Sequence, residues 1–200
     1  MPTTVGVSEA GDPSDATASG GWSQATRLAA LDLLGEAVRE RPALLEVRGS
    51  CMVPIVRDGD RVTVSPCRSP RLGDLVLARD ARDRLVCHRV LALEPEGLLL
   101  AGDRTSLSEV HPRAAVLGRV TEVIRGNRRL GLDSRAARWM DRPLARLHSA
   151  TLPRGGAGRR VTGWRLWLLE RLRLVLVYAR GMGWLAAGRV DAKRATGDGR

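Results

Sequence analysis

Two residues of this sequence could act together in acyl transfer: the thiol of Cys51 and the imidazole of His88. A thiol becomes a nucleophile when it loses its proton, and an imidazole that titrates near neutrality can take that proton or hold it in a thiolate–imidazolium pair. Cys51 lies in the segment Gly49-Ser-Cys-Met-Val-Pro54, where Gly49 permits a positive φ and Pro54 fixes its own φ. The segment therefore predicts a rigid bend that presents Cys51 between two strands.

Three neighbouring residues are rival nucleophiles, and each meets an objection. Ser50 precedes Cys51, so on an extended chain its side chain points to the opposite face, which leaves it as a backup or an oxyanion donor. Cys87 precedes His88 and, by the same alternation, faces away from it. Cys67 lies in a predicted loop with no partner in view. The three cysteines and His88 lack the paired spacing of zinc ligands, so we expect no metal and no other cofactor.

Short strands and turns must position these residues. Alternating apolar segments, separated by Gly, Pro and Asp, occupy residues 43–132 and predict a compact, mostly antiparallel β-domain. The predicted strands are 45–48, 61–64, 74–79, 85–93, 97–101 and 115–125, with a further candidate at 128–132. In this pattern Cys51 lies between the first two strands and His88 lies within the fourth.

The motifs occur in an order that is informative. The segment 49–54, Gly-x-Cys-Met-x-Pro, is followed by Gly59-Asp60-x-Val62. It resembles the nucleophile motif of the signal peptidase I / self-cleaving repressor peptidase superfamily (S24/S26-like), in which a serine stands where this chain has Cys51. Farther on, 73–76 (Gly-Asp-Leu-Val) precedes 88–90 (His-Arg-Val), where bacterial signal peptidases have Lys-Arg-Val and the archaeal and endoplasmic-reticulum branch has His. The resemblance covers about residues 44–125 and implies a mainly β fold, with a signal-peptidase-like catalytic domain flanked by N-terminal and C-terminal helices.

The resemblance also implies the reaction. It would be cleavage of a precursor peptide after small residues, with Cys51 as nucleophile and His88 as base. Asp103, in the segment 101–104 (Ala-Gly-Asp-Arg), is similar to the family's Gly-Asp box and would orient His88, with Glu109 as the alternative carboxylate.

Further site residues follow from the same resemblance. Met52 and Pro54 would contact the substrate. The backbone N–H of Cys51 would donate to the oxyanion, because position 49 is glycine and lacks the side-chain donor of the bacterial enzymes; Ser50 could substitute for it.

The segments outside the β-domain carry most of the basic charge. We expect a disordered segment at 1–22, a helix at 23–42 capped by Ser23, a helix at 133–150, a linker at 151–161, an amphipathic helix at 162–188 and a disordered tail at 189–200. The net charge is +11, and 18 of the 33 Lys and Arg but only 5 of the 22 Asp and Glu lie at or beyond residue 125. This distribution favours an anionic partner.

The helix at 162–188 is the candidate contact with a membrane surface. Arginines interrupt its apolar residues, so it would lie in the membrane interface and not cross it; docking on the β-domain or on a second subunit is the alternative. No hydrophobic segment opens the chain, so we expect no signal peptide and a location in the cytoplasm or peripheral to the inner membrane. We do not expect nucleic acid as the principal partner.

Two other functions stay open at this point. In one, the protein is a self-cleaving regulator whose repressor-like Ala10-Gly11 pair reaches its own site, although residues 23–40 are too short for a DNA-binding helix-turn-helix domain. In the other, the protein is a non-catalytic module that binds a membrane or nucleic acid through its basic tail.

Overall fold

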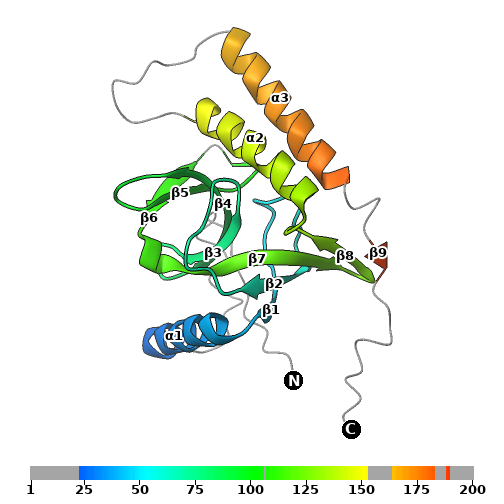
Figure 1. Ribbon diagram of the computed structural model, residues 1–200. Helices are drawn as coiled ribbons and strands as arrows, with labels where there is room; N and C mark the ends of the chain where they lie inside the picture. The colour runs from blue at the N-terminus through cyan, green and yellow to red at the C-terminus, as the bar shows by residue number, and fades with distance from the viewer. Residues whose placement is uncertain (1–22, 106, 153–163, 183–187, 190–200) are drawn as a thin grey trace.

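The computed structural model describes residues 23–105, 107–152, 164–182 and 188–189, and it shows an antiparallel β-sheet with flanking helices (Figure 1). In chain order the elements are α1 (Gln24–Glu40), β1 (Ala43–Glu46), β2 (Arg61–Ser65), β3 (Leu75–Arg79), β4 (Leu85–Leu93), β5 (Leu98–Ala101), β6 (Ser108–His111), η1 (Arg113–Ala115), β7 (Val116–Arg125), β8 (Arg128–Gly131), α2 (Arg135–Thr151), α3 (Trp164–Gly181) and β9 (Gly188–Arg189). The mainly β fold with flanking helices that the sequence predicts is confirmed.

Within the described residues, the strands form one nine-stranded sheet in the order β1-β2-β7-β3-β4-β5-β6, to which β8 and β9 add beyond β7. Neighbouring strands pair in the antiparallel sense, and β7 pairs with β2, β3 and β8. The ladders shift register between Thr63 and Val64 and between Leu77 and Ala78. Such irregularities bend a sheet, and here they let it curve around a core.

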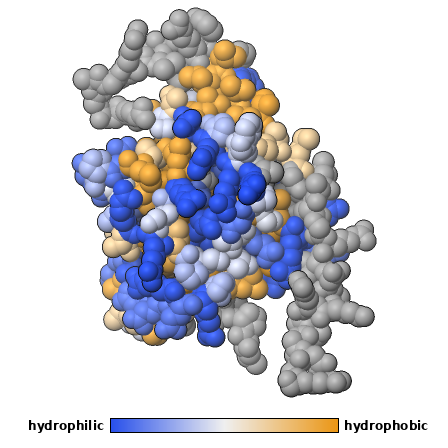
Figure 2. All heavy atoms as spheres, in the orientation of Figure 1, coloured by the Kyte–Doolittle hydropathy of each residue, from blue (hydrophilic) through white to orange (hydrophobic). Residues whose placement is uncertain are grey.

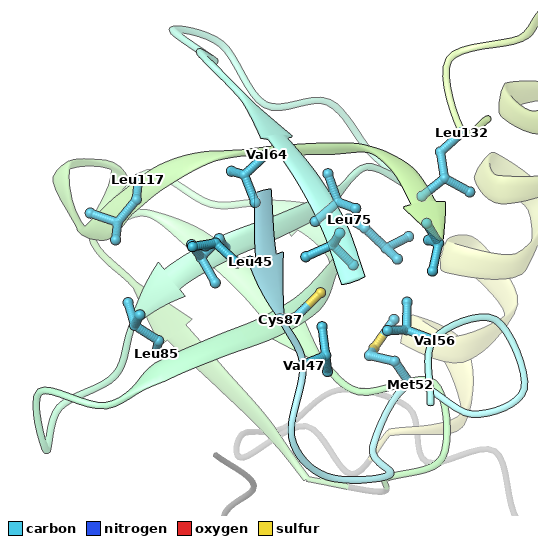
Figure 3. Close-up of a cluster of buried hydrophobic side chains, with 14 of the residues drawn as sticks. Leu45, Val47, Met52, Val56, Val64, Leu75, Leu85, Cys87, Leu117 and Leu132 are labelled. Atoms are coloured by element: carbon cyan, nitrogen blue, oxygen red, sulfur yellow. The ribbon is translucent and has the colours of Figure 1, made fainter. Parts of the chain in front are cut away.

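The main core holds the segment that carries Cys51 in place. Figure 3 shows Met52 and Val56, from the connection between β1 and β2, beside Cys87 of β4 within one cluster of buried side chains. Met52, Ile55 and Val56 are at most 2 % exposed. Because burial of such side chains is worth about 1.5–3 kcal/mol each, the connection is anchored by the core and is not a free loop.

Helices cover the sheet at two places (Figure 1). α1 begins at the cap Ser23, as the sequence predicts, and packs on β7. A Cβ at Gly118 of β7 would lie 2.6 Å from Val38 of α1, so only glycine allows this approach. α2 begins at the cap Ser134, packs on β4, and in turn carries α3.

Much of the exposed surface of α3 is apolar, although Glu170 and Arg171 are exposed as well. Leu168, Leu172, Val175 and Tyr178 are about half exposed or more. Among the helices that the structure describes, none combines the length and the hydropathy needed to span a bilayer. The predicted contact of residues 162–188 with a membrane surface stays a prediction.

Some sequence predictions need correction in detail. The first strand is Ala43–Glu46 and not 45–48, because its partners are residues 61–64 of β2. The strand Ser108–His111 was not expected, and Gly188–Arg189 pairs with β8 although a disordered tail was predicted from 189. The predictions for residues 1–22, for most of the linker and for 190–200 lie outside the described residues.

Candidate active site

The predicted bend that carries Cys51 is present. Gly49 adopts a φ of 102°, which favours glycine, and its N–H donates to Oδ1 of Asp58 at 2.8 Å. The peptide bond between Val53 and Pro54 is cis. Cys51 is partly buried at this bend and packs against the main core.

A second segment, residues 102–104, meets the bend. The backbone O of Cys51 accepts the N–H of Arg104 at 2.9 Å. A Cβ at Gly102 would fall 2.8 Å from the Cβ of Cys51, so the contact requires a residue without a side chain. The N–H of Asp103 points to the Sδ of Met52 at 3.4 Å. These contacts fix the position of Cys51 from both sides.

The residue of β4 that faces Cys51 is Cys87. The Sγ of Cys51 lies 3.9 Å from the backbone O of Cys87, and Cys87 is 2 % exposed. Burial, followed by the nearby Cys51 and Asp103, raises the pKa of the Cys87 thiol. Cys87 is therefore a neutral thiol at neutral pH, and only Cys51 of this pair is partly accessible.

His88 lies on the other face of β4, so the predicted pairing of His88 with Cys51 is not found in the structure. Its cross-strand partner is Val76, and Val76 belongs with Val86 and Val90 to a second buried cluster, away from Cys87. Burial and the nearby His111 lower the pKa of His88 to about 4. The alternation of Cys87 and His88 was predicted correctly, but the face that meets Cys51 is that of Cys87.

The sequence predicted that Asp103 orients His88. In the structure the carboxylate of Asp103 binds Arg89 instead. Nε and Nη2 of Arg89 donate to the two oxygens of Asp103 at 2.7 and 2.8 Å. Nη1 of Arg89 donates to the backbone O of Gly73 at 2.8 Å and lies 3.1 Å from Oδ1 of Asp141. Arg89 and Asp103 are both fully buried, so we call Arg89 with its three oxygen-bearing partners the arginine centre.

Of the other predicted site residues, Glu109 and Ser50 are exposed, whereas Met52 and Pro54 are buried. Glu109 is 66 % exposed on β6 and lies 3.6 Å from Nε2 of His111, not beside His88. Met52 and Pro54 are buried, so their side chains support the bend and do not present a surface to a substrate. Ser50 is exposed beside Cys51, and its backbone O accepts the N–H of Val53 at 3.2 Å.

His148 of α2 is a further candidate that the sequence did not single out. Its Nε2 lies 3.0 Å from the backbone O of Thr105, one residue beyond the segment that touches Cys51. Its Nδ1 is buried with no hydrogen-bond partner among the described residues. Burial and the nearby Arg173 lower the pKa of His148 to about 4. No sequence motif surrounds His148, so its nearness to the segment 102–104 becomes visible only when α2 packs on the sheet.

No group of three His, Cys, Asp or Glu side chains in the described part of the chain is arranged to hold a metal ion. The described groups next to Cys51 include the backbone carbonyl of Cys87, the thiol of Cys87 and the segment 102–104. This arrangement can present a thiol to a bound chain, and it differs from the family pattern in the place of the imidazole.

Comparison with known proteins agrees with the motifs. A family model described as Peptidase S24-like matches residues 3–121. The match covers more than half of the 200 residues and includes the bend, β4 and the segment 102–104. No curated protein matches the chain.

Proposed function

Because the chain belongs to the peptidase S24-like family, we propose that it is a thiol peptidase whose nucleophile is Cys51. The observation that carries this proposal is the place of Cys51. It lies on a bend anchored by the core, and it is partly accessible whereas Cys87 beside it is buried. By the resemblance of its motif it corresponds to the family's nucleophile. A nucleophile held at a rigid bend loses little entropy when a substrate reaches it.

The proposed reaction has two steps. The Cys51 thiolate attacks the scissile carbonyl carbon, the carbon–nitrogen bond breaks, and the leaving amine takes a proton. Water then attacks the thioester, releasing the new carboxyl end and restoring the thiol. The substrate, as in the sequence-based proposal, is a precursor peptide cut after small residues.

Two histidines are candidates for accepting the thiol proton. His88 occupies the family's base position but lies on the far face of β4. His148 lies against the segment that follows Gly102, and Gly102 touches Cys51. We therefore infer that His148 is the better placed of the two. Both are neutral at pH 7, so each has a ring nitrogen that can accept a proton, and burial, which lowers both pKa values to about 4, makes them weaker bases than an ordinary histidine.

The test is cleavage of peptides that carry small residues before the scissile bond. We expect Cys51→Ala to abolish cleavage and Arg61→Ala, at an exposed position of β2, to leave it intact. His148→Gln should reduce turnover more than His88→Gln does. Equal cleavage by wild type and Cys51→Ala would reject the proposal. The intact mass of the purified chain over time tests self-cleavage after Ala10 in the same samples.

The second candidate function is a non-catalytic binding protein of the same family. The observation that favours it is the orientation of His88 away from Cys51, which departs from the family's nucleophile–base pairing. A chloromethyl ketone peptide that labels Cys51 no faster than Cys67 would support this function and count against the peptidase.

A further inference from the structure

An arginine-lined groove lies apart from the bend that carries Cys51. It has a volume of about 300 Å³ and runs between the connection from β2 to β3, strand β7 and the start of α2. Four arginines line it: Arg68, Arg71, Arg119 and Arg138. Figure 2 shows one face of the molecule, with hydrophilic residues across its middle below the hydrophobic surface of α3.

The carboxylates near the groove offset these charges only in part. Arg119 lies 2.6 Å and Arg138 3.7 Å from the same oxygen of Asp133, which is 44 % exposed. Asp74, the one acidic residue of the lining, accepts the backbone N–H of Arg71 and lies 3.8 Å from Arg119. Within the part of the chain that the structure describes, the side chains of Arg68 and Arg71 form no ion pair.

The helix that borders the groove adds to its positive potential. α2 begins at Arg135 and has no acidic side chain in its first turn, which contains Arg138. The positive end of a helix dipole is ordinarily matched by an acid, and here it adds to four guanidinium groups. Arginine-lined clefts of this kind concentrate anions.

The lining distinguishes among anionic ligands. It contains no aromatic side chain on which a base could stack, and its volume is at the lower end of the range for ligand pockets. Guanidinium groups bind carboxylates through paired hydrogen bonds. We propose that the groove binds a short acidic segment of a peptide, and that this peptide is the substrate presented to Cys51.

The groove and the bend are joined through the arginine centre. The groove continues into a smaller pocket lined by Gly73, and Gly73 accepts a hydrogen bond from Arg89. Arg89 binds Asp103, and its neighbour Gly102 touches Cys51. Because Arg89 and Asp103 are fully buried, this chain of contacts couples the groove to the bend through the protein interior. In the proposal, the acidic segment is a specificity element that lies apart from the scissile bond. In this respect the inference rests on the proposed peptidase function.

Equilibrium binding tests the groove without any cleavage. The full chain with Cys51→Ala is titrated into a fluorescent peptide that contains a run of glutamates, and into the same peptide with glutamines. We expect only the acidic peptide to bind, with an affinity that falls as salt rises. Removing Arg68 and Arg71 together should weaken binding about tenfold. Each arginine would lose one exposed ion pair with the peptide, and two such pairs together contribute about as much free energy as a tenfold change in affinity. The matched control, Arg61→Ala with Arg82→Ala, removes equal charge from exposed positions elsewhere and should bind as the parent does.

Cys67 supplies an independent readout because it lines the groove. Burial raises the pKa of its thiol, so alkylation is measured at mildly alkaline pH. The acidic peptide should slow alkylation of Cys67, whereas the glutamine peptide should not. Equal binding of the two peptides, equal loss in the two double variants, or displacement of the acidic peptide by an oligonucleotide at equal concentration would overturn the inference. Binding with no cleavage by the wild type would instead count against the proposed peptidase alone.

Discussion

The two faces of β4 accommodate polar side chains in opposite ways. On one face Arg89 is fully buried and charged, and it is held by Asp103, Asp141 and the backbone O of Gly73. On the other face His88 is partly buried on the side of β4 that carries Val86 and Val90, and desolvation lowers its pKa to about 4, so its imidazole is neutral at pH 7. Adjacent residues of one strand thus differ because Arg89 has carboxylate and carbonyl oxygens within hydrogen-bond distance, whereas for His88 the desolvation outweighs the nearby Asp103 and Asp80.

The difference explains which residue of the motif is structural. Arg89 ties β4 to α2 and to the segment 102–104 that supports Cys51. His88 instead pairs across the strands with Val76, a member of the second cluster.

The largest effect is expected from Arg89→Ala. The substitution leaves the buried carboxylate of Asp103 without its counter-charge, so the free energy of unfolding should fall by about 3–5 kcal/mol. Urea denaturation at pH 7 measures it. The double variant Arg89→Met with Asp103→Leu removes both charges and should recover much of the loss. A double variant as unstable as Arg89→Ala would show that volume, not charge, matters at this position.

Acidic pH should lower the free energy of unfolding through His88 on the other face of β4, and through His148 of α2. The pKa of His88 and of His148 is about 4 in the fold, against an ordinary value near 6.5. Between these values the unfolded chain binds more protons than the folded chain, so stability is full above about pH 6.5 and falls as the pH drops. The loss reaches about 3 kcal/mol per histidine below pH 4.

Urea unfolding at several pH values measures this loss, and the difference between wild type and His88→Leu isolates one histidine from the titrating carboxylates. His88→Leu should show a shallower decline below pH 6.5. Parallel curves for the two proteins would mean that His88 titrates normally in the fold.

A smaller loss is expected where the arginine centre meets the bend. In Gly102→Ala the new methyl group would lie 2.8 Å from the Cβ and 2.9 Å from the O of Cys51, so one segment must move. Overpacking of this kind costs about 1–3 kcal/mol. The alkylation rate of Cys51 should change as well, because its two supports separate. Gly131→Ala is the matched control, since nothing lies within 4 Å of the added carbon.

The sequence predicts elements better than it predicts which of them meet. The strand 85–93 and the bend at 49–54 follow from local patterns of alternation, glycine and proline. Whether Cys87 or His88 faces Cys51 depends on how the bend docks on β4, and that docking is set by contacts distant in sequence. Nor does any local pattern bring His148 of α2 to Thr105. The family motif predicts a pairing of Cys51 with His88, and the structure places Cys87 beside Cys51 instead.

The smallest effect should come from an exposed counterpart of the buried pair. Nη2 of Arg79 lies 2.6 Å from Oδ1 of Asp32, as close as Arg89 lies to Asp103, but Asp32 is 69 % exposed. Water competes for both groups, so Asp32→Ala should lower the free energy of unfolding by about 0.2–1 kcal/mol, and high salt should reduce that difference. Urea midpoints at low and high salt test this. A loss as large as that of Arg89→Ala would show that the distance between the charges, and not their burial, sets the strength of an arginine–carboxylate pair in this fold.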